Sequence, residues 1–221
     1  MIVKDPRFET PVWNTIIWRY MSFEKFLDVI LENRLFFTNT TKMTDKNECS
    51  IPRKNADLLW SQGHRILVKK WKEVSDLKRS SFLNCWIMSR FESYALWKIY
   101  LSGSKAGIAI KTNTKDLITA FNDCKNPSNE RIYFGKVNYT DFIQGEIDIS
   151  KLITTKKQFY EFENEVRLVI LKDPQEIENS NDEVIKWDDG IHINVDPNVL
   201  IDEIYLSPFC GSYCNRKITM L

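Results

Sequence analysis

The segment Phe162-Glu163-Asn164-Glu165-Val166-Arg167 runs directly into the apolar residues Leu168-Val169-Ile170-Leu171. Alternate residues of a β-strand share a face, so a strand over 163–171 sends Glu163, Glu165 and Arg167 to one side. Glu161 precedes them on that side as a strand-entry residue, and the opposite side carries Phe162, Val166, Leu168 and Ile170. Carboxylates on one face of a buried strand cost free energy unless that face is wet or the charges are paired. The segment therefore predicts the wall of a binding cleft.

Composition limits the class of protein. With 221 residues, 43% hydrophobic and 13% aromatic, the chain can bury a full core, and we expect one α+β domain over residues 1–221. Lys and Arg total 31 against 30 for Asp and Glu, a formal net charge of +1. A charge this close to zero gives no global electrostatic case for nucleic acid or an anionic membrane, so any such contact must be local.

Neither a secretion signal nor a membrane span is expected. The N-terminal residues lack a charged-then-apolar pattern, and no apolar run approaches about 18 residues, which predicts a cytoplasmic protein without a membrane partner. Five cysteines, an odd number, favour free thiols. Cys210 and Cys214 could form a metal pair, but a structural zinc needs four ligands and only two histidines are present, so no metal is expected.

Hydrophobic periodicity predicts alternating strands and helices, with mainly antiparallel strand connections in the second half. Helices are expected after Ser22 as N-cap, over 56–74, over 92–100 and around 117–121, with a polar loop over 38–54. The lysines at 69, 70 and 72 are interpreted as a solvated helix face. Strands are expected at 16–20, 35–37, 81–88, 107–110, 132–139, 163–171, 191–195 and 201–206.

Two chemistries use an acidic strand face together with an arginine. In glycosidic bond cleavage a carboxylate stabilises positive charge developing on a sugar ring, while the arginine binds a phosphate in bidentate fashion. In metal-dependent phosphodiester hydrolysis, clustered carboxylates hold magnesium. The second chemistry lacks a supporting lysine motif in this sequence.

Several motifs together resemble one bacterial domain family catalogued as a domain of unknown function. The match runs from about Trp18 to Pro208, and the order of elements is similar to the ADP-ribosyltransferase superfamily of the arginine-serine-glutamate type. The motifs are Trp18-Arg19-Tyr20, Asp45-Lys46-Asn47-Glu48, Cys85-Trp86, Glu92-Ser93, Leu96-Trp97 with Tyr100, Gly107-Ile108-Ala109-Ile110, Val137-Asn138-Tyr139-Thr140-Asp141, Glu163-Asn164-Glu165-Val166-Arg167 and Ile204-Tyr205-Leu206-Ser207-Pro208.

The resemblance implies two small, mainly antiparallel sheets flanked by helices, with an NAD cleft between them. It implies that Arg19 holds the phosphate and nicotinamide ribose of NAD. Glu165 would bond the ribose hydroxyl and support an oxocarbenium-like transition state, and Glu163 would position or deprotonate the acceptor. Asn84 stands where related sequences have serine, and its amide can still hydrogen-bond ribose or nicotinamide. Ser80, Ser81 and Ser89 lie nearby in the sequence and are the alternatives for the serine role.

Structural interpretations stand beside these roles. Arg19 and Glu165 could form a buried salt bridge, and Arg167 is expected to orient Glu165. Tyr20, Trp86, Trp97 and Tyr100 could stack on nicotinamide or adenine, although aromatic residues at such spacing are usually core. Asp45 and Glu48 belong either to a helix-capping turn or to a lid that contacts substrate.

The expected function is NAD-dependent mono-ADP-ribosyl transfer by an intracellular toxin or anti-phage effector. NAD is then a substrate, the acceptor a nucleic acid or a protein, and an antitoxin protein a further partner. One alternative is a non-catalytic NAD- or nucleotide-binding module, which the Asn84 departure favours. A magnesium-dependent nuclease is the other.

Overall fold

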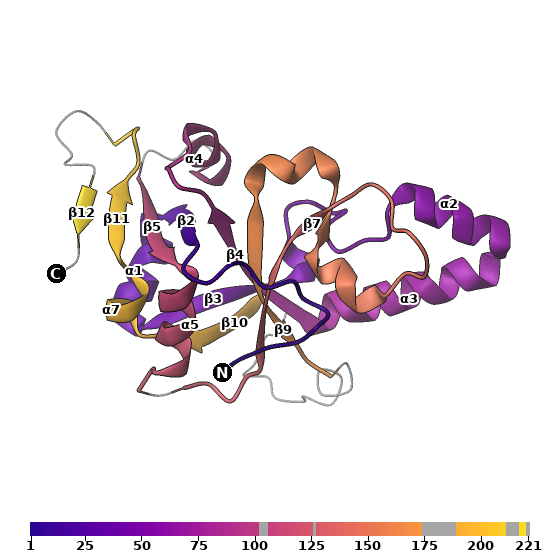
Figure 1. The fold of residues 1–221 in the computed structure, drawn as a ribbon, viewed down its shortest axis with the longest axis horizontal. Coiled ribbons are helices and arrows are strands. Elements are labelled where there is room, and N and C mark those ends of the chain that lie inside the picture. The colour runs from indigo at the N-terminus through magenta and orange to yellow at the C-terminus, as the bar shows by residue number, and fades with distance from the viewer. Residues whose placement is uncertain (102–105, 126, 174–188, 211–216, 220–221) are drawn as a thin grey trace.

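The chain forms an α+β fold in which helices flank a mixed sheet (Figure 1). The structure is a computed structural model that describes residues 1–101, 106–125, 127–173, 189–210 and 217–219. Its helices are α1 Phe23–Glu32, α2 Arg53–Gln62, α3 His64–Ser80, α4 Tyr94–Leu101, α5 Thr114–Asn122 and α7 Pro197–Leu200, with 3-10 helices η1 Thr40–Lys42, η2 Ile149–Thr154 and η3 Gln158–Glu163. Its strands are β1 Ile2–Val3, β2 Ile16–Ser22, β3 Arg34–Asn39, β4 Ser81–Met88, β5 Gly107–Asn113, β6 Ile132–Lys136, β7 Asn138–Tyr139, β8 Thr155–Lys156, β9 Glu165–Leu171, β10 Gly190–Asn194, β11 Glu203–Leu206 and β12 Lys217–Thr219.

The expectation of two small sheets is wrong, because ten of these strands form one hydrogen-bonded sheet. Its main path runs β1-β6-β9-β4-β2-β5-β11-β12, and β3 branches from β4 to pair with β10. Strand β1 runs parallel to β6, and the other pairs in this sheet are antiparallel. Strands β7 and β8 form a separate parallel pair. The predicted predominance of antiparallel pairing is confirmed.

The sheet forks at β4. One edge of β4 pairs with β9 along its whole length. The other edge pairs with β2 only through Ile87 and Met88, and with β3 only through Phe82 and Leu83. Among the described strands, none pairs with residues 84–86 on that edge. The fork divides this part of the ten-stranded sheet into two wings. One wing contains β2, β5 and β11, and the other contains β3 and β10.

The start of the acidic strand differs from the sequence prediction. Strand β9 begins at Glu165, and Glu163 is instead the last residue of η3. Asn164 between them has φ 43°, a left-handed conformation that asparagine tolerates better than most residues. Its backbone carbonyl and side-chain amide both bond to Met88 at the end of β4, at 2.9 and 2.8 Å. This turn breaks the alternation, so Phe162 points to solvent with 54% of its surface exposed and does not join the core.

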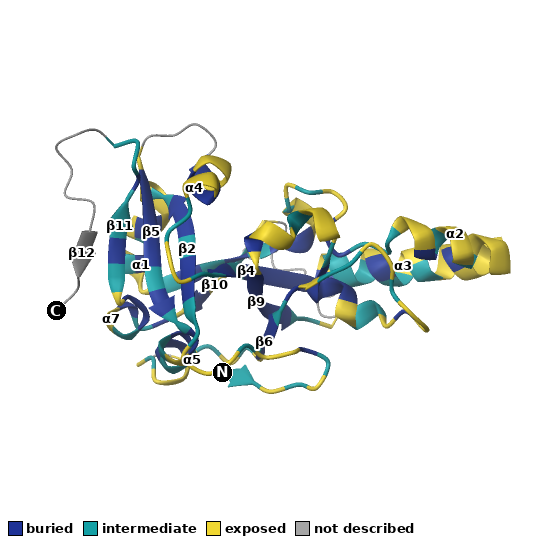
Figure 2. Cartoon of the chain, turned by 45° about the horizontal axis from the view of Figure 1, so that its top comes forward, coloured by how far each residue is buried: buried dark blue, intermediate teal, exposed yellow. Residues whose placement is uncertain are grey.

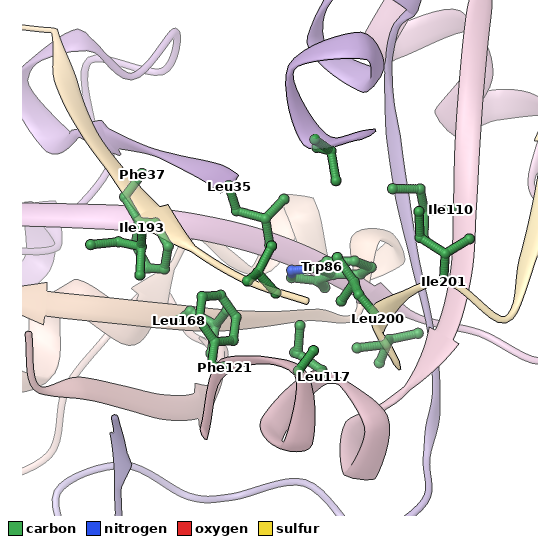
Figure 3. Close-up of a cluster of buried hydrophobic side chains, with 14 of the residues drawn as sticks. Leu35, Phe37, Trp86, Ile110, Leu117, Phe121, Leu168, Ile193, Leu200 and Ile201 are labelled. Atoms are coloured by element: carbon green, nitrogen blue, oxygen red, sulfur yellow. The ribbon is translucent and has the colours of Figure 1, made fainter. Parts of the chain in front are cut away.

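Strand β9 is buried on both faces. Val166, Leu168 and Ile170 join the main hydrophobic cluster, where Leu117 and Phe121 of α5 pack near Leu168 and Trp86 (Figure 3). On the opposite face Val169 packs in a second cluster with Cys49 and Ile153. A charged side chain on that face, Arg167, must therefore find its partners inside the protein.

One helix expected over 56–74 is two helices in the structure. Gly63, with φ 145° in a region that disfavours side chains, separates α2 from α3. The two helices pack side by side as a hairpin that projects from the body of the protein (Figure 1). We call this hairpin the arm. The N-cap role of Ser22 is confirmed, since its side chain accepts from the backbone of Lys25, and β4 has the expected bounds 81–88.

We expect Leu168→Ala to lower the free energy of unfolding by about 2–5 kcal/mol, because it leaves a cavity at a fully buried position. Phe162→Ala should change it by less than about 0.5 kcal/mol, since Phe162 is exposed. Urea unfolding measures both. A large cost for Phe162→Ala would instead support an uninterrupted strand from 162.

Candidate functional site

Five charged residues from separate segments meet beside the start of β9. They are Glu48 in the loop before α2, Lys156 in β8, Glu163 at the end of η3, and Glu165 and Arg167 in β9. We call them the charge cluster. All five side chains are at least nine-tenths buried, so three carboxylates and two cations are held largely away from water.

Arg167 lies at the centre of the charge cluster and is fully buried. Its Nε donates to Oε1 of Glu165 at 2.9 Å and its Nη2 to Oε2 of the same carboxylate at 3.1 Å, a bidentate pair. Nη2 also donates to Glu48, and Nη1 donates to the carbonyl of Ile153 at 2.7 Å. The expectation that Arg167 orients Glu165 is confirmed.

Lys156 joins the three carboxylates. Its Nζ lies 2.6 Å from Oε2 of Glu163, 3.2 Å from Oε2 of Glu165 and 3.7 Å from Oε2 of Glu48. It also lies 4.8 Å from the ring centre of Tyr160. Burial opposes the charge of Lys156, yet the surrounding carboxylates raise its pKa. Lys156 therefore stays protonated and fixes the two glutamates relative to one another.

The two glutamates of the predicted pair have pKa values displaced in opposite directions. Burial would raise the pKa of Glu165, but Arg167 and Lys156 outweigh it and hold this pKa at about 2. Burial dominates at Glu163 and raises its pKa, because Lys156 offsets the loss of water only in part. One carboxylate is thus held ionised, and its neighbour is more easily protonated. Such a separation is how active sites assign distinct roles to two acids.

Glu165 and Glu163 also differ in the donors that surround them. The carboxylate of Glu165 receives Arg167 and Lys156, and the Cys85 thiol donates to it as well. Glu163 makes one such contact, from Lys156 to Oε2. The thiol is the weakest of the donors on Glu165, so it is the contact that a ligand hydroxyl displaces most easily.

Arg19 of β2 reaches across the fork. Its Nη1 donates to the carbonyl of Cys85 at 2.6 Å, at the stretch of β4 that lacks a strand partner, and its guanidinium lies 5.9 Å from the ring centre of Trp86. The possible Arg19–Glu165 salt bridge is not formed, and no described carboxylate lies within ion-pair distance of Arg19. Burial lowers the pKa of Arg19, and the nearby charge of Glu165 partly opposes this. Among the described residues, the half-buried guanidinium of Arg19 forms a hydrogen bond through Nη1 alone, and a guanidinium of this kind is suited to an anionic ligand.

Tyr100 of α4 lies next to these groups. Its ring stacks on Tyr20 with centroids 6.2 Å apart, and 39% of its surface is exposed. Burial of the hydroxyl and the charges of Glu165 and Glu163 raise its pKa, while Arg19 lowers it. Tyr100 is therefore an exposed aromatic side chain whose hydroxyl senses both the arginine and the glutamates.

The other aromatic candidates and Asn84 lie in the interior. Tyr20 and Trp97 belong to a buried cluster on the β2 wing, and Trp86, with no exposed surface, belongs to the main core (Figure 3). The amide of Asn84 donates to the carbonyl of Phe36 at 2.9 Å, and its oxygen accepts from Nε1 of Trp86 at 2.7 Å. Both ends of the Asn84 side chain are thus engaged in holding β3 and Trp86 at the fork.

The loop residues Asp45 and Glu48 separate into two roles. Asp45 stabilises a turn, since its side chain accepts from the backbone of Asn47 at 2.8 Å and its carbonyl from that of Glu48 at 3.0 Å. Glu48 is buried in the charge cluster. Asp45 thus belongs to a turn, but this turn does not cap a helix, because α2 begins only at Arg53 and its N-cap is Pro52. Glu48 belongs to neither a helix cap nor an open lid.

Two cavities lie elsewhere. One, of about 390 Å³, is formed around the ends of α1, α5 and β10, and the other, of about 470 Å³, lies between the arm and the segment 142–147. Neither is lined by Arg19 or by the glutamate pair. Within the described ranges, no group of three His, Cys, Asp or Glu residues is arranged to hold a metal ion, and no helix has the length and apolarity of a membrane span. Cys214, the second cysteine of the possible metal pair, lies outside the described residues.

Comparison of the chain with protein-family models, with curated proteins and with solved structures gave no match.

Sequence reasoning missed Lys156. In the printed sequence it is one of two adjacent lysines in a polar stretch, and nothing in its neighbours marks it as buried. Only the fold brings β8 against the glutamate pair. Glu48 was identified as a candidate, but its partner Arg167 is 119 residues away in the sequence.

The depressed pKa of Glu165 makes stability depend on pH. Its pKa is about 2 in the folded protein against a usual value of 4.5, so the stabilising contribution is present above about pH 4.5 and is lost as pH falls towards 2. The contribution is on the order of 3 kcal/mol. We expect the difference in unfolding free energy between wild type and Glu165→Gln to shrink between about pH 5.5 and 2.5.

Urea unfolding at several pH values measures this difference. Glu161→Gln is the matched control, because Glu161 is exposed and lies in the same segment, and it should track the wild type at every pH. A difference for Glu165→Gln that stays constant with pH would contradict the buried ion pair.

Proposed function

We propose that this protein is an NAD-dependent mono-ADP-ribosyltransferase. The observation that carries the proposal is that Arg19 lies close enough to Glu165 for their charges to interact, while Glu165 and Glu163 have pKa values shifted apart. Among the described residues, the side chain of Arg19 donates to the carbonyl of Cys85 through Nη1. These groups lie on β2, β9 and the end of η3, around the fork in the sheet. The sequence resemblance assigns the same three residues to NAD and acceptor binding.

Each residue suits the step proposed for it. Arg19 binds the pyrophosphate of NAD, since a guanidinium makes paired, charge-assisted bonds to phosphate oxygens. Glu165 stays ionised and faces the nicotinamide ribose. There its carboxylate accepts a hydrogen bond from a ribose hydroxyl in place of the Cys85 thiol. Its negative charge stabilises the positive charge of an oxocarbenium-like transition state. Arg167 and Lys156 hold that carboxylate in position.

The reaction has a defined balance of bonds and protons. The bond from the ribose anomeric carbon to the nicotinamide nitrogen breaks, and nicotinamide leaves with the electron pair. The acceptor nucleophile forms the new bond to that carbon and loses its proton to Glu163. A raised pKa makes Glu163 a better proton acceptor than an ordinary carboxylate.

The proposed ligand set changes relative to the sequence expectation. Tyr100 is the exposed aromatic side chain at this place and is our candidate for contact with nicotinamide. Tyr20, Trp86, Trp97 and Asn84 would act by supporting Arg19 and Tyr100 from the interior.

A non-catalytic NAD- or nucleotide-binding module is the second candidate. The engaged amide of Asn84 favours it, because the serine position of the resembled superfamily is then filled by a structural side chain. A magnesium-dependent nuclease has less support, since Lys156 and Arg167 already pair with the three carboxylates that would hold the metal. An intracellular toxin or anti-phage effector, controlled by an antitoxin protein, remains the setting that we propose.

The deciding experiment follows nicotinamide release and acceptor labelling together. Wild-type protein is incubated with NAD labelled in the nicotinamide or in the adenosine part, with cell lysate as the source of acceptors. We expect Glu165→Gln to lower both signals by about a hundredfold or more. Glu163→Gln should lose acceptor labelling but keep nicotinamide release to water. Digestion of the labelled material with protease or nuclease identifies the acceptor class.

Glu161→Gln, exposed and one turn away, is the control and should behave as the wild type. Near-ultraviolet circular dichroism of each variant separates lost chemistry from lost folding. NAD binding by the wild type without nicotinamide release would favour the binding module, and full activity of folded Glu165→Gln would refute the proposed role.

A further inference from the structure

The arm differs in charge from the rest of the protein. Helices α2 and α3 span residues 53–80 and contain eight Lys and Arg against three Asp and Glu, a net charge of +5. The remainder of the chain contains 23 against 27, a net charge of −4. The net charge of the whole chain is close to zero because the positive charge of the arm nearly cancels the negative charge of the rest of the protein. A local field of this kind attracts a polyanion.

Three cations form a continuous stripe along α3. Arg65, Lys69 and Lys72 follow i, i+4, i+7 spacing, which places them on one face over about 10 Å of helix. All three are exposed, and none forms an ion pair with a residue that the structure describes. The adjacent cation Lys70, in contrast, pairs with Glu73 at 3.1 Å. The stripe therefore presents three charges without local neutralisation.

Two exposed indoles lie to one side of the stripe, with Trp71 about 100° around α3 from Lys72. Trp60 and Trp71 keep 57% and 51% of their surfaces exposed. Much of the arm has the yellow colour of exposed residues (Figure 2). Trp60 sets its ring edge against His64 with centroids 4.9 Å apart, and His64 and Trp71 lie seven residues apart on the same flank of α3. A solvated helix face has no need of two exposed indoles.

We propose that the arm binds single-stranded nucleic acid, with the Arg65, Lys69 and Lys72 stripe on the phosphates and Trp71 and Trp60 stacked on unpaired bases. Cations that follow the backbone beside aromatic faces that accept any base are the general means of binding single strands. An acidic protein would match the charge but would leave the flat, exposed indoles unexplained. This inference concerns a surface outside the charge cluster and does not depend on the proposed transfer.

The base of the arm is bonded to the loop that supplies Glu48 to the charge cluster. Nζ of Lys78 donates to the carbonyl of Lys46 and the hydroxyl of Ser50, on either side of Glu48 in the loop. A nucleic acid bound to the arm would therefore lie on a helix that is hydrogen-bonded to the loop containing Glu48. If the proposed function holds, the arm would select a nucleic-acid acceptor.

Fluorescence anisotropy with labelled 20-nucleotide single-stranded RNA and DNA, and with the corresponding duplex, tests the proposal. We expect the combined Arg65→Gln, Lys69→Gln and Lys72→Gln variant to bind single strands at least about tenfold more weakly between about 50 and 200 mM KCl. The slope of log affinity against log salt should become shallower by about 2, as expected for three lost phosphate contacts at ~0.7 each. Trp71→Ala should weaken binding by about tenfold without changing that slope.

The matched control removes the same charge from the body through Lys4→Gln, Lys25→Gln and Lys115→Gln, all exposed positions, and should bind as the wild type. Glu165→Gln, if folded, should also bind as the wild type, which separates this test from that of the transfer. The proposal is overturned by absence of binding at about 50 mM salt, by equal loss in the body control, or by equal affinity for duplex. It is also overturned if Trp71→Ala leaves single-strand binding unchanged. Binding of an acidic protein by the arm, without binding of single-stranded nucleic acid, would overturn it as well.

Discussion

The buried pair of Arg167 and Glu165 is the interaction on which the rest of the site depends. A strand covered on both faces leaves a charged side chain no route to water, so Arg167 must be satisfied internally. It recruits Glu48 from a loop more than a hundred residues away in the sequence and the carbonyl of Ile153. Loop, strand and η2 are thereby fixed to one another. Removal of one member leaves the others charged and unpaired in the interior, which is more costly than the pair is stabilising.

The fork in the sheet follows a related logic. Residues 84–86 of β4 lack a strand partner on one edge, and a buried carbonyl without a donor is costly. The Arg19 side chain supplies the donor to Cys85, and Asn84 bridges to β3. Arg19 therefore has a structural role at this gap, and it lies close enough to Glu165 for the two charges to interact. We interpret the site as a consequence of a sheet that does not close.

Much of the fold could be predicted from the sequence, because local patterns suffice for β2, β4, β5 and the N-cap at Ser22. The fork could not, since it depends on which strands pair and over how many residues. The Glu163–Glu165 pair was identified as a unit, but its geometry was misjudged because Asn164 breaks the alternation that a strand reading assumes. Lys156 could not be found at all, because its burial arises only from tertiary packing.

The most direct measurement is the separate titration of Glu163 and Glu165 by carboxyl-carbon nuclear magnetic resonance. We expect Glu165 to remain ionised until the pH falls to about 2, and Glu163 to take up its proton above the usual value of 4.5. Titration of Glu165→Gln and Glu163→Gln assigns the two signals. Titration of both carboxyls together near pH 4.5 would contradict a buried pair whose pKa values are shifted in opposite directions.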